Sequence, residues 1–148
     1  MTRIPPPSLP FEVAREVAND CLCLHAQRTA RTLARRFDGA LRHLNLTNGQ
    51  FSLLMSLNRR DPPTMGSVSD LLAMDRTTLT ANLKPLVRRR LVRSVADEAD
   101  GRVRRLELTA EGTRLLVCAV PVWRREHAAI ERDLVDADRL RADLRALS

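Results

Sequence analysis

Apolar residues recur at three- and four-residue intervals through most of the chain, which is the period of one face of an α-helix. The first such run starts at Phe11, after a proline-rich segment over residues 1–10 that cannot form a stable helix. Arginines fill the positions between the apolar residues, which are Val13, Val17, Cys21, Leu24, Ala30, Leu33, Phe37, Leu41 and Leu44. This pattern predicts a flexible arm followed by one long amphipathic helix.

Helix-start signals divide the middle of the chain into three shorter helices. Thr47 and Gln50 have the spacing of a capping box, in which each side chain binds the backbone N–H of the other residue. Two prolines after Asp61 break the chain, and Asp75 has the position and chemistry of an N-cap. The predicted helices cover residues 48–58, 65–72 and 76–90.

After residue 90 the apolar period changes from about 3.6 to about 2, which is the period of a β-strand. The pattern predicts strands over residues 91–95 and 103–108, joined by a turn at Asp100 and Gly101. Helices followed by a hairpin predict a mainly α protein with a small β-wing, a winged helix-turn-helix.

The helical period then returns for the rest of the chain. Thr109 and Asp136 have the chemistry of N-caps for two further helices, and Pro121 should bend the first of them. With the helix from Phe11, these helices carry more apolar surface than one winged helix can cover. They are therefore expected to form a helical dimerisation scaffold.

The helix predicted over residues 76–90 presents two different faces. One stripe is apolar and should pack inward; it consists of Leu79, Leu83, Leu86 and Val87. The opposite side should face solvent and consists of Thr77, Ala81, Lys84 and Arg88, with Thr78 and Thr80 flanking it. Short hydroxyl side chains suit base edges and phosphates, and the two cations suit the phosphate backbone, so this face is a candidate DNA-reading surface.

Charge supports the same interpretation through its location more than through its total. The net charge is +7, and a basic surface attracts polyanions by releasing their counterions. Between Arg76 and Arg105 there are nine basic and three acidic residues, so most of the excess lies in the predicted winged helix.

Several other classes of protein are disfavoured. No apolar run approaches the roughly 18 residues of a membrane span, and no secretory leader is evident, so we expect a cytoplasmic protein. The three cysteines, Cys21, Cys23 and Cys118, lack the paired spacing of a zinc site or a disulfide framework. No nucleophile, phosphate-binding or metalloprotease motif is present, so we expect neither an enzyme nor a cofactor.

Three segments together resemble the MarR family of bacterial transcriptional regulators. They are LTNGQFSLLMSL, VSDLLAMDRTTLTANLKPLVRRRLV and DEADGRVRRLELTAEG, which match the family in order and spacing over roughly residues 20–148. The resemblance implies a homodimer that binds near-palindromic double-stranded DNA operators, usually as a repressor. It divides the chain into an arm (1–10), an N-terminal dimerisation helix (11–45), a DNA-binding domain (46–109) and C-terminal dimerisation helices (110–148).

By the same resemblance, one helix enters the major groove and the wing enters the minor groove. Arg102 at the wing tip is then the minor-groove arginine, and Asp100 orients its guanidinium. The expected DNA-binding residues are Arg76, Thr77, Thr78, Thr80, Lys84, Arg88, Arg102 and Arg104.

The sequence departs from the family pattern at three positions. Ala73 and Arg90 stand where glycines are common, which raises a question about local backbone geometry. Ala81 replaces a longer polar residue, which leaves base recognition to fewer side chains.

The cysteines suggest two alternatives for the signal. Cys23 aligns with the reactive cysteine of the peroxide-sensing branch of the family, and Cys118 is a candidate second thiol across the dimer. That branch surrounds its cysteine with tyrosines, and this chain has none. The other interpretation is that Cys21 and Cys23 are small apolar residues buried in the dimer scaffold.

A small acidic aromatic effector is the remaining candidate signal. By family analogy its pocket would lie between the dimerisation helices and the DNA-binding lobe, where His25, Arg28 or Arg31 would meet it. A non-specific architectural DNA-binding protein is the alternative function, and footprinting would separate it from an operator-specific regulator.

Overall fold

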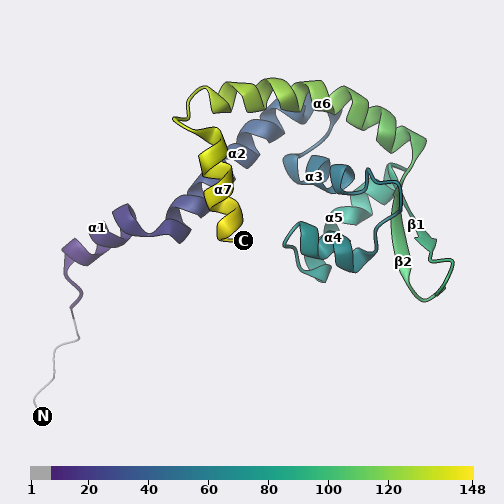
Figure 1. Cartoon of the computed structure of the whole chain (residues 1–148), viewed down its shortest axis with the longest axis horizontal. Helices are drawn as coiled ribbons and strands as arrows, with labels where there is room; N and C mark the ends of the chain where they lie inside the picture. The colour runs from purple at the N-terminus through teal and green to yellow at the C-terminus, as the bar shows by residue number, and fades with distance from the viewer. Residues whose placement is uncertain (1–7) are drawn as a thin grey trace, which may run out of the picture. The chain divides into compact units, whose positions relative to one another are not determined.

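Figure 1 shows the chain as a computed structural model, which describes residues 8–148. Most of the arm expected over residues 1–10 therefore lies outside the described part. The chain forms two units, one ending at Arg35 and one running from Arg36 to Ser148. Helices dominate the described residues, and a single two-stranded sheet accompanies them, as the sequence predicted.

The segment from Phe11 to Leu41 forms two helices where the sequence predicted one. Helix α1 (Phe11–Asp20) ends at Cys21, whose backbone is extended, and α2 (Leu22–Leu41) starts immediately afterwards. The prediction of one continuous helix was wrong because it rested on apolar period alone. Asn19 and Asp20 are poor helix formers, and the Cys21 Sγ accepts the backbone N–H of Leu24 at 3.4 Å, which caps the new helix.

A 3₁₀ turn, η1 (Arg42–Leu44), follows α2 and ends at Asn45, which has a left-handed backbone. Helix α3 (Asn48–Ser56) then begins with the predicted capping box. Gln50 N–H donates to the Thr47 hydroxyl at 3.2 Å, and Thr47 N–H donates to the Gln50 side-chain oxygen at 3.1 Å.

Two further helices form the helix-turn-helix. Helix α4 (Met65–Leu71) is capped by Thr64, which the sequence did not single out, and α5 (Arg76–Arg88) is capped by Asp75, as predicted. The turns at both ends of α5 contain a residue with a left-handed backbone, Ala73 (φ 48°) before it and Arg90 (φ 59°) after it. These are the two positions at which the sequence lacks an expected glycine.

Strands β1 (Val92–Ala96) and β2 (Arg104–Leu108) form the wing. They pair antiparallel, with Val92 opposite Leu108 and Ala96 opposite Arg104. A bridge between Thr64 and Arg105 adds the loop before α4 to the other edge of β2.

Helix α6 (Ala110–Glu131) continues through Pro121 and is arched along its length (Figure 1), and α7 (Ala137–Ala146) follows it after an Asp136 cap. The start of α6 lies very close to the wing. A Cβ atom at Gly112 would be only 2.2 Å from the carbonyl oxygen of Leu91. No side chain other than hydrogen fits there, which explains the glycine in the L-T-x-x-G motif.

The core joins α3, α4 and α5 to β1, β2 and α6. Its largest fully buried side chains are Leu41, Leu53, Leu54, Leu79, Leu86, Val68 and Val92. The predicted inward stripe of α5 is buried at Leu79, Leu83 and Leu86. Val87 was assigned to it wrongly: its side chain is 46% exposed, because it lies one step around the helix from Leu86. Across residues 8–148, no helix combines the length and apolar character that membrane crossing requires.

Candidate nucleic-acid interface

The outward face of α5 forms a shallow depression of about 340 Å³. Five residues line it: Arg76, Thr77, Thr80, Ala81 and Lys84. All five are exposed, as are Thr78 and Arg88. The fold therefore brings Arg76, Thr77, Thr80 and Lys84 of the predicted DNA-reading surface together around one depression, where the short Ala81 side chain leaves room, and keeps Thr78 and Arg88 open to solvent.

Two threonines on this face already use their hydroxyl protons. The Thr78 hydroxyl donates to Asp75 at 2.7 Å, and the Thr80 hydroxyl donates to the carbonyl oxygen of Arg76 at 2.7 Å. Their oxygen atoms retain lone pairs that can accept from the exocyclic amino groups of adenine or cytosine.

Asp75 fixes the start of α5 as an anion. The Thr78 backbone N–H, which donates to it at 2.9 Å, and then the Thr78 hydroxyl lower the pKa of the Asp75 carboxyl below its usual value. The carboxylate is thereby engaged within the helix cap, where a negative charge is favourable.

Arg76 and Arg89 reach away from α5 to neighbouring segments. A Cβ atom at Gly66 would lie 3.8 Å from Nη2 of Arg76, so this guanidinium covers the first turn of α4. Arg89 donates to the carbonyl oxygen of Asn45 at 2.6 Å and so ties the end of α5 to the η1 turn.

Three arginines of the wing are engaged within the protein. Arg93 pairs with Glu107 across the strands, and Arg105 pairs with Asp97. Arg104 donates to the Ser94 side-chain oxygen at 3.0 Å and to the Ser94 carbonyl oxygen at 2.7 Å. The charge excess counted in the sequence is therefore partly neutralised on the wing. Arg104, an expected DNA contact, lies along β1.

The contact between Asp100 and Arg102 differs from the expected one. Oδ1 of Asp100 accepts the backbone N–H of Arg102 at 3.0 Å, so Asp100 shapes the turn and does not hold the guanidinium directly. The Arg102 residue itself is exposed at the tip of the hairpin.

Asp97 is a residue that the sequence analysis did not single out. Its Oδ1 accepts the backbone N–H groups of Ala99 at 2.9 Å and Asp100 at 3.0 Å. The Arg105 guanidinium, followed by these N–H groups, lowers the pKa of the Asp97 carboxyl below its usual value. Its place directly after β1, beside the strand that carries Arg105, was the signal that could have identified it.

The cysteines differ in their surroundings. Cys23 and Cys118 are exposed within this chain, and Cys21, directly before α2, is half-buried. The Gln27 side-chain amide donates to the Cys23 Sγ at 3.3 Å. Burial of Cys23 and Cys21 in a dimer scaffold stays a prediction.

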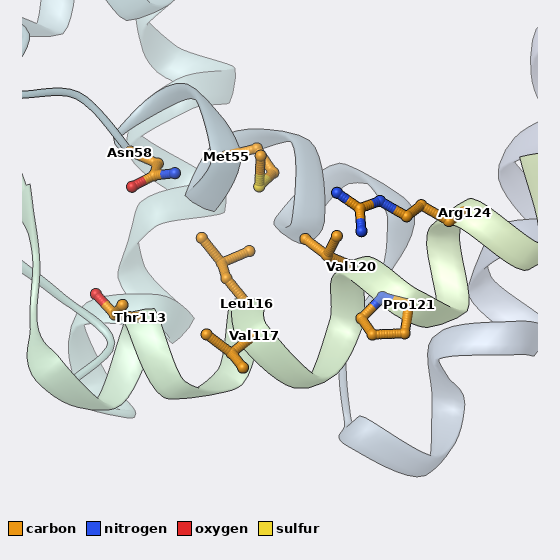
Figure 2. A pocket seen from close by; sticks show the side chains of 8 residues that line it. All are labelled: Met55, Asn58, Thr113, Leu116, Val117, Val120, Pro121 and Arg124. Atoms are coloured by element: carbon orange, nitrogen blue, oxygen red, sulfur yellow. The ribbon is translucent and has the colours of Figure 1, made fainter.

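A hollow of about 310 Å³ lies between α3 and α6 (Figure 2). Met55 and Leu116 point toward each other across it, with Arg124 at one end and Asn58 and Thr113 at the other. The expected effector residues His25 and Arg28 instead line a separate depression on α2. Arg31 donates to the Gln27 side chain at 3.3 Å.

An aromatic stack connects the same two helices, α3 and α6. The Trp123 ring of α6 is stacked on Phe51 of α3, with their centroids 6.3 Å apart. The centroid of the His127 ring also lies 4.8 Å from that of Trp123. The stack joins α6 to the DNA-binding lobe through apolar contact.

Comparisons with known proteins bear on these surfaces. The model of the MarR family matches residues 44–103. The crystal structure of the M. tuberculosis transcriptional regulator MosR in complex with DNA is 41% identical, with 86% of this chain and 93% of that chain covered and a TM-score of 0.79.

Two further structures have the same fold. One is another crystal structure of the M. tuberculosis transcriptional regulator MosR, at 39% identity, with 87% of this chain and 93% of that chain covered and a TM-score of 0.76. The other is a probable transcriptional regulator from Pseudomonas aeruginosa, at 23% identity, with 88% and 99% covered and a TM-score of 0.80. No curated protein matches the chain.

Proposed function

The chain belongs to the MarR family of DNA-binding transcriptional regulators, and from this premise we propose that it is a homodimeric repressor of a near-palindromic operator. A small ligand or the oxidation of a thiol releases it from DNA. The observation that carries the proposal is the open outward face of α5, where Arg76, Thr77 and Lys84 surround one depression. A major groove admits such a helix.

Each DNA-binding element has a distinct role in this proposal. The α5 residues Thr77, Thr78 and Thr80 meet base edges, and Arg76, Lys84 and Arg88 bind phosphates. On the wing, Arg102 enters the minor groove, and Arg104 adds positive charge beside it. These assignments follow from exposure and chemistry, because every one of the eight residues is exposed.

Dimerisation would cover apolar side chains that are exposed in the single chain. Phe11 of α1 and Leu147 beyond α7 are 73% and 74% exposed, and other exposed apolar residues are Val17, Leu22, Val117, Val135, Leu140 and Leu144. These residues lie on or directly beside the helices outside the winged domain, where the family places its two-fold interface, although Leu71 and Val87 are also exposed within the winged domain. A regulator with two copies of α5 reads two half-sites about one helical turn apart.

Release by a small ligand is supported by the hollow between α3 and α6. Its wall is apolar at Met55, Leu116 and Val120, and Arg124 supplies a positive charge at one end. An apolar or aromatic acid has matching chemistry. Filling the hollow would alter the packing of α6 against α3, and α3 packs against α5.

Release by oxidation is the second candidate, and the exposure of Cys23 and its hydrogen bond from Gln27 favour it. The Cys23 thiolate would attack an organic hydroperoxide, giving a sulfenic acid and an alcohol. The sulfenic acid would then condense with the Cys118 thiol to a disulfide, and water would leave.

One experiment tests the proposal and its alternatives. The purified protein selects duplexes from a randomised DNA pool, and the affinity for the selected duplex is compared with that for random DNA at several salt concentrations. Selection of a near-palindrome supports an operator-specific regulator, whereas equal affinity for all duplexes means an architectural DNA-binding protein. Adding aromatic acids or cumene hydroperoxide to the complex, with Cys23→Ser as the control, then separates the two signals.

A further inference from the structure

Arg105 connects the wing to the loop before α4. Its Nη1 donates to the carbonyl oxygen of Pro62 at 2.8 Å, and its Nε pairs with the Asp97 carboxylate. The planar guanidinium presents several N–H groups in a fixed fork, so one side chain can hold both partners at once. Pro62 and Asp97 lie on opposite sides of β2, since β1 borders one edge and the loop borders the other.

The loop is a firm anchor for this contact. Residues Pro62 and Pro63 have fixed φ angles, and the Pro63 carbonyl oxygen accepts the backbone N–H of Leu106 at 2.9 Å. Thr64 then forms a bridge with Arg105 itself. A two-stranded hairpin alone is only marginally stable, so this third edge supplies the constraint that the wing otherwise lacks.

A series of hydrogen bonds continues from Arg105 to the wing tip. The Asp97 carboxylate that pairs with Arg105 also accepts the N–H groups of Ala99 and Asp100. The Asp100 carboxylate in turn accepts the N–H of Arg102. The Asp97 side chain is 12% exposed and the Arg105 side chain 36% exposed, so their ion pair is partly shielded from water.

We propose that Arg105 and Asp97 are positioning residues of the wing. They hold the turn that carries Arg102 at a fixed place relative to the DNA-binding lobe, and they thereby determine how strongly the protein distinguishes narrow A·T minor grooves from wider G·C ones. This inference rests on the proposed function, because it assumes that Arg102 enters the minor groove. Neither residue touches the DNA in this proposal, and both act through Arg102.

The test uses the full-length protein and two duplexes. One is the duplex that the native protein selects from a randomised pool, and the other has G·C pairs in place of A·T pairs where footprinting locates the wing. The readout is the ratio of the two affinities. A variant with a smaller folded fraction loses affinity for both duplexes equally, so the ratio responds to the placement of the wing and not to stability.

Arg105→Ala should lower this ratio by on the order of 5-fold, the lower end of what a specific contact contributes. Arg105→Lys should lower it as well, because an ammonium group does not reproduce the fork. Arg93→Ala is the matched control. It removes one wing arginine and one cross-strand ion pair but no contact with the loop, and it should leave the ratio unchanged.

A double variant decides whether Arg105 acts through Arg102. In the Arg102→Ala background, Arg105→Ala should have no further effect on the ratio. The proposal is overturned if the effect persists in that background, or if Arg105→Ala and Arg93→Ala change the ratio equally. Failure of the proposed function looks different, because the native protein itself would then select no duplex or would show no preference between the two.

Discussion

Gly112 offers a direct test of how α6 is packed on the winged domain. Replacing it with alanine places a methyl group 2.2 Å from the Leu91 carbonyl oxygen and 3.1 Å from a methyl carbon of Leu108. The carbonyl belongs to backbone that cannot rotate away. Because a Cβ atom essentially never lies within 3.0 Å of such a neighbour, the start of α6 must move by roughly 1 Å.

The energetic cost has two parts. Overpacking of this kind costs about 1–3 kcal/mol. Moving α6 also stretches the hydrogen bonds from Thr109 N–H to Leu91 (3.1 Å) and from the Thr109 hydroxyl to Arg90 (2.7 Å), each contributing about 1 kcal/mol. The higher helix propensity of alanine relative to glycine offsets about 1 kcal/mol of this cost. The expected loss in the free energy of unfolding is therefore about 2–4 kcal/mol.

Urea denaturation followed by far-ultraviolet circular dichroism measures this loss, at one fixed protein concentration because dimerisation adds to stability. Gly39→Ala is the matched control: it lies in α2, and its added Cβ would meet nothing within 4 Å. It should stabilise the protein by about 0.5–1 kcal/mol. The reasoning fails if Gly112→Ala is as stable as the native protein, or if both variants lose the same free energy.

Three further outcomes are expected. Thr78→Ala should reduce the preference for the selected duplex over random DNA. Arg88→Ala should weaken binding to the two kinds of DNA equally and reduce the dependence of log affinity on log salt concentration by about one unit. If quantitative binding titrations give the same result for both variants, the assignment of Thr78 to bases and Arg88 to phosphates is wrong. Sedimentation equilibrium at micromolar concentration should give a dimer, and a folded monomer would refute the proposed scaffold. The pKa of Asp97 is lowered in the folded protein, so the Asp97 carboxylate contributes stability above its ordinary pKa, and this contribution is lost as the pH falls through the lowered pKa. The difference in free energy of unfolding between the native protein and Asp97→Asn should therefore become smaller in acid. A difference that does not depend on pH would argue against the Arg105 pairing.

Local sequence signals predicted most of the helix and strand boundaries. The capping box at Thr47, the cap at Asp75 and the turn at Asp100 each bind backbone groups a few residues away, so their chemistry can be read without the fold. Ala73 and Arg90 stand where the family commonly has glycine, which pointed to unusual backbone geometry, and the structure has a left-handed backbone at both residues.

Other features depended on segments that are distant in the sequence. The pairing of Arg105 with Pro62 joins residues 43 positions apart, and charge counting alone treated this arginine as part of a DNA-binding excess. The break at Cys21 was missed for a different reason, because the apolar period continues through it. Val87 was assigned to the inward stripe although it lies one step around the helix from Leu86, at the edge of that stripe, where it is exposed.

The stack of Trp123 on Phe51 makes the protein suitable for label-free spectroscopy. Trp123 is the chain's one tryptophan, so the whole indole emission arises from the contact between α6 and α3. Any event that shifts these helices against each other will change the polarity around the ring and move the emission maximum. Stopped-flow fluorescence can therefore resolve the order of events, showing whether α6 moves before the protein leaves its operator or only afterwards.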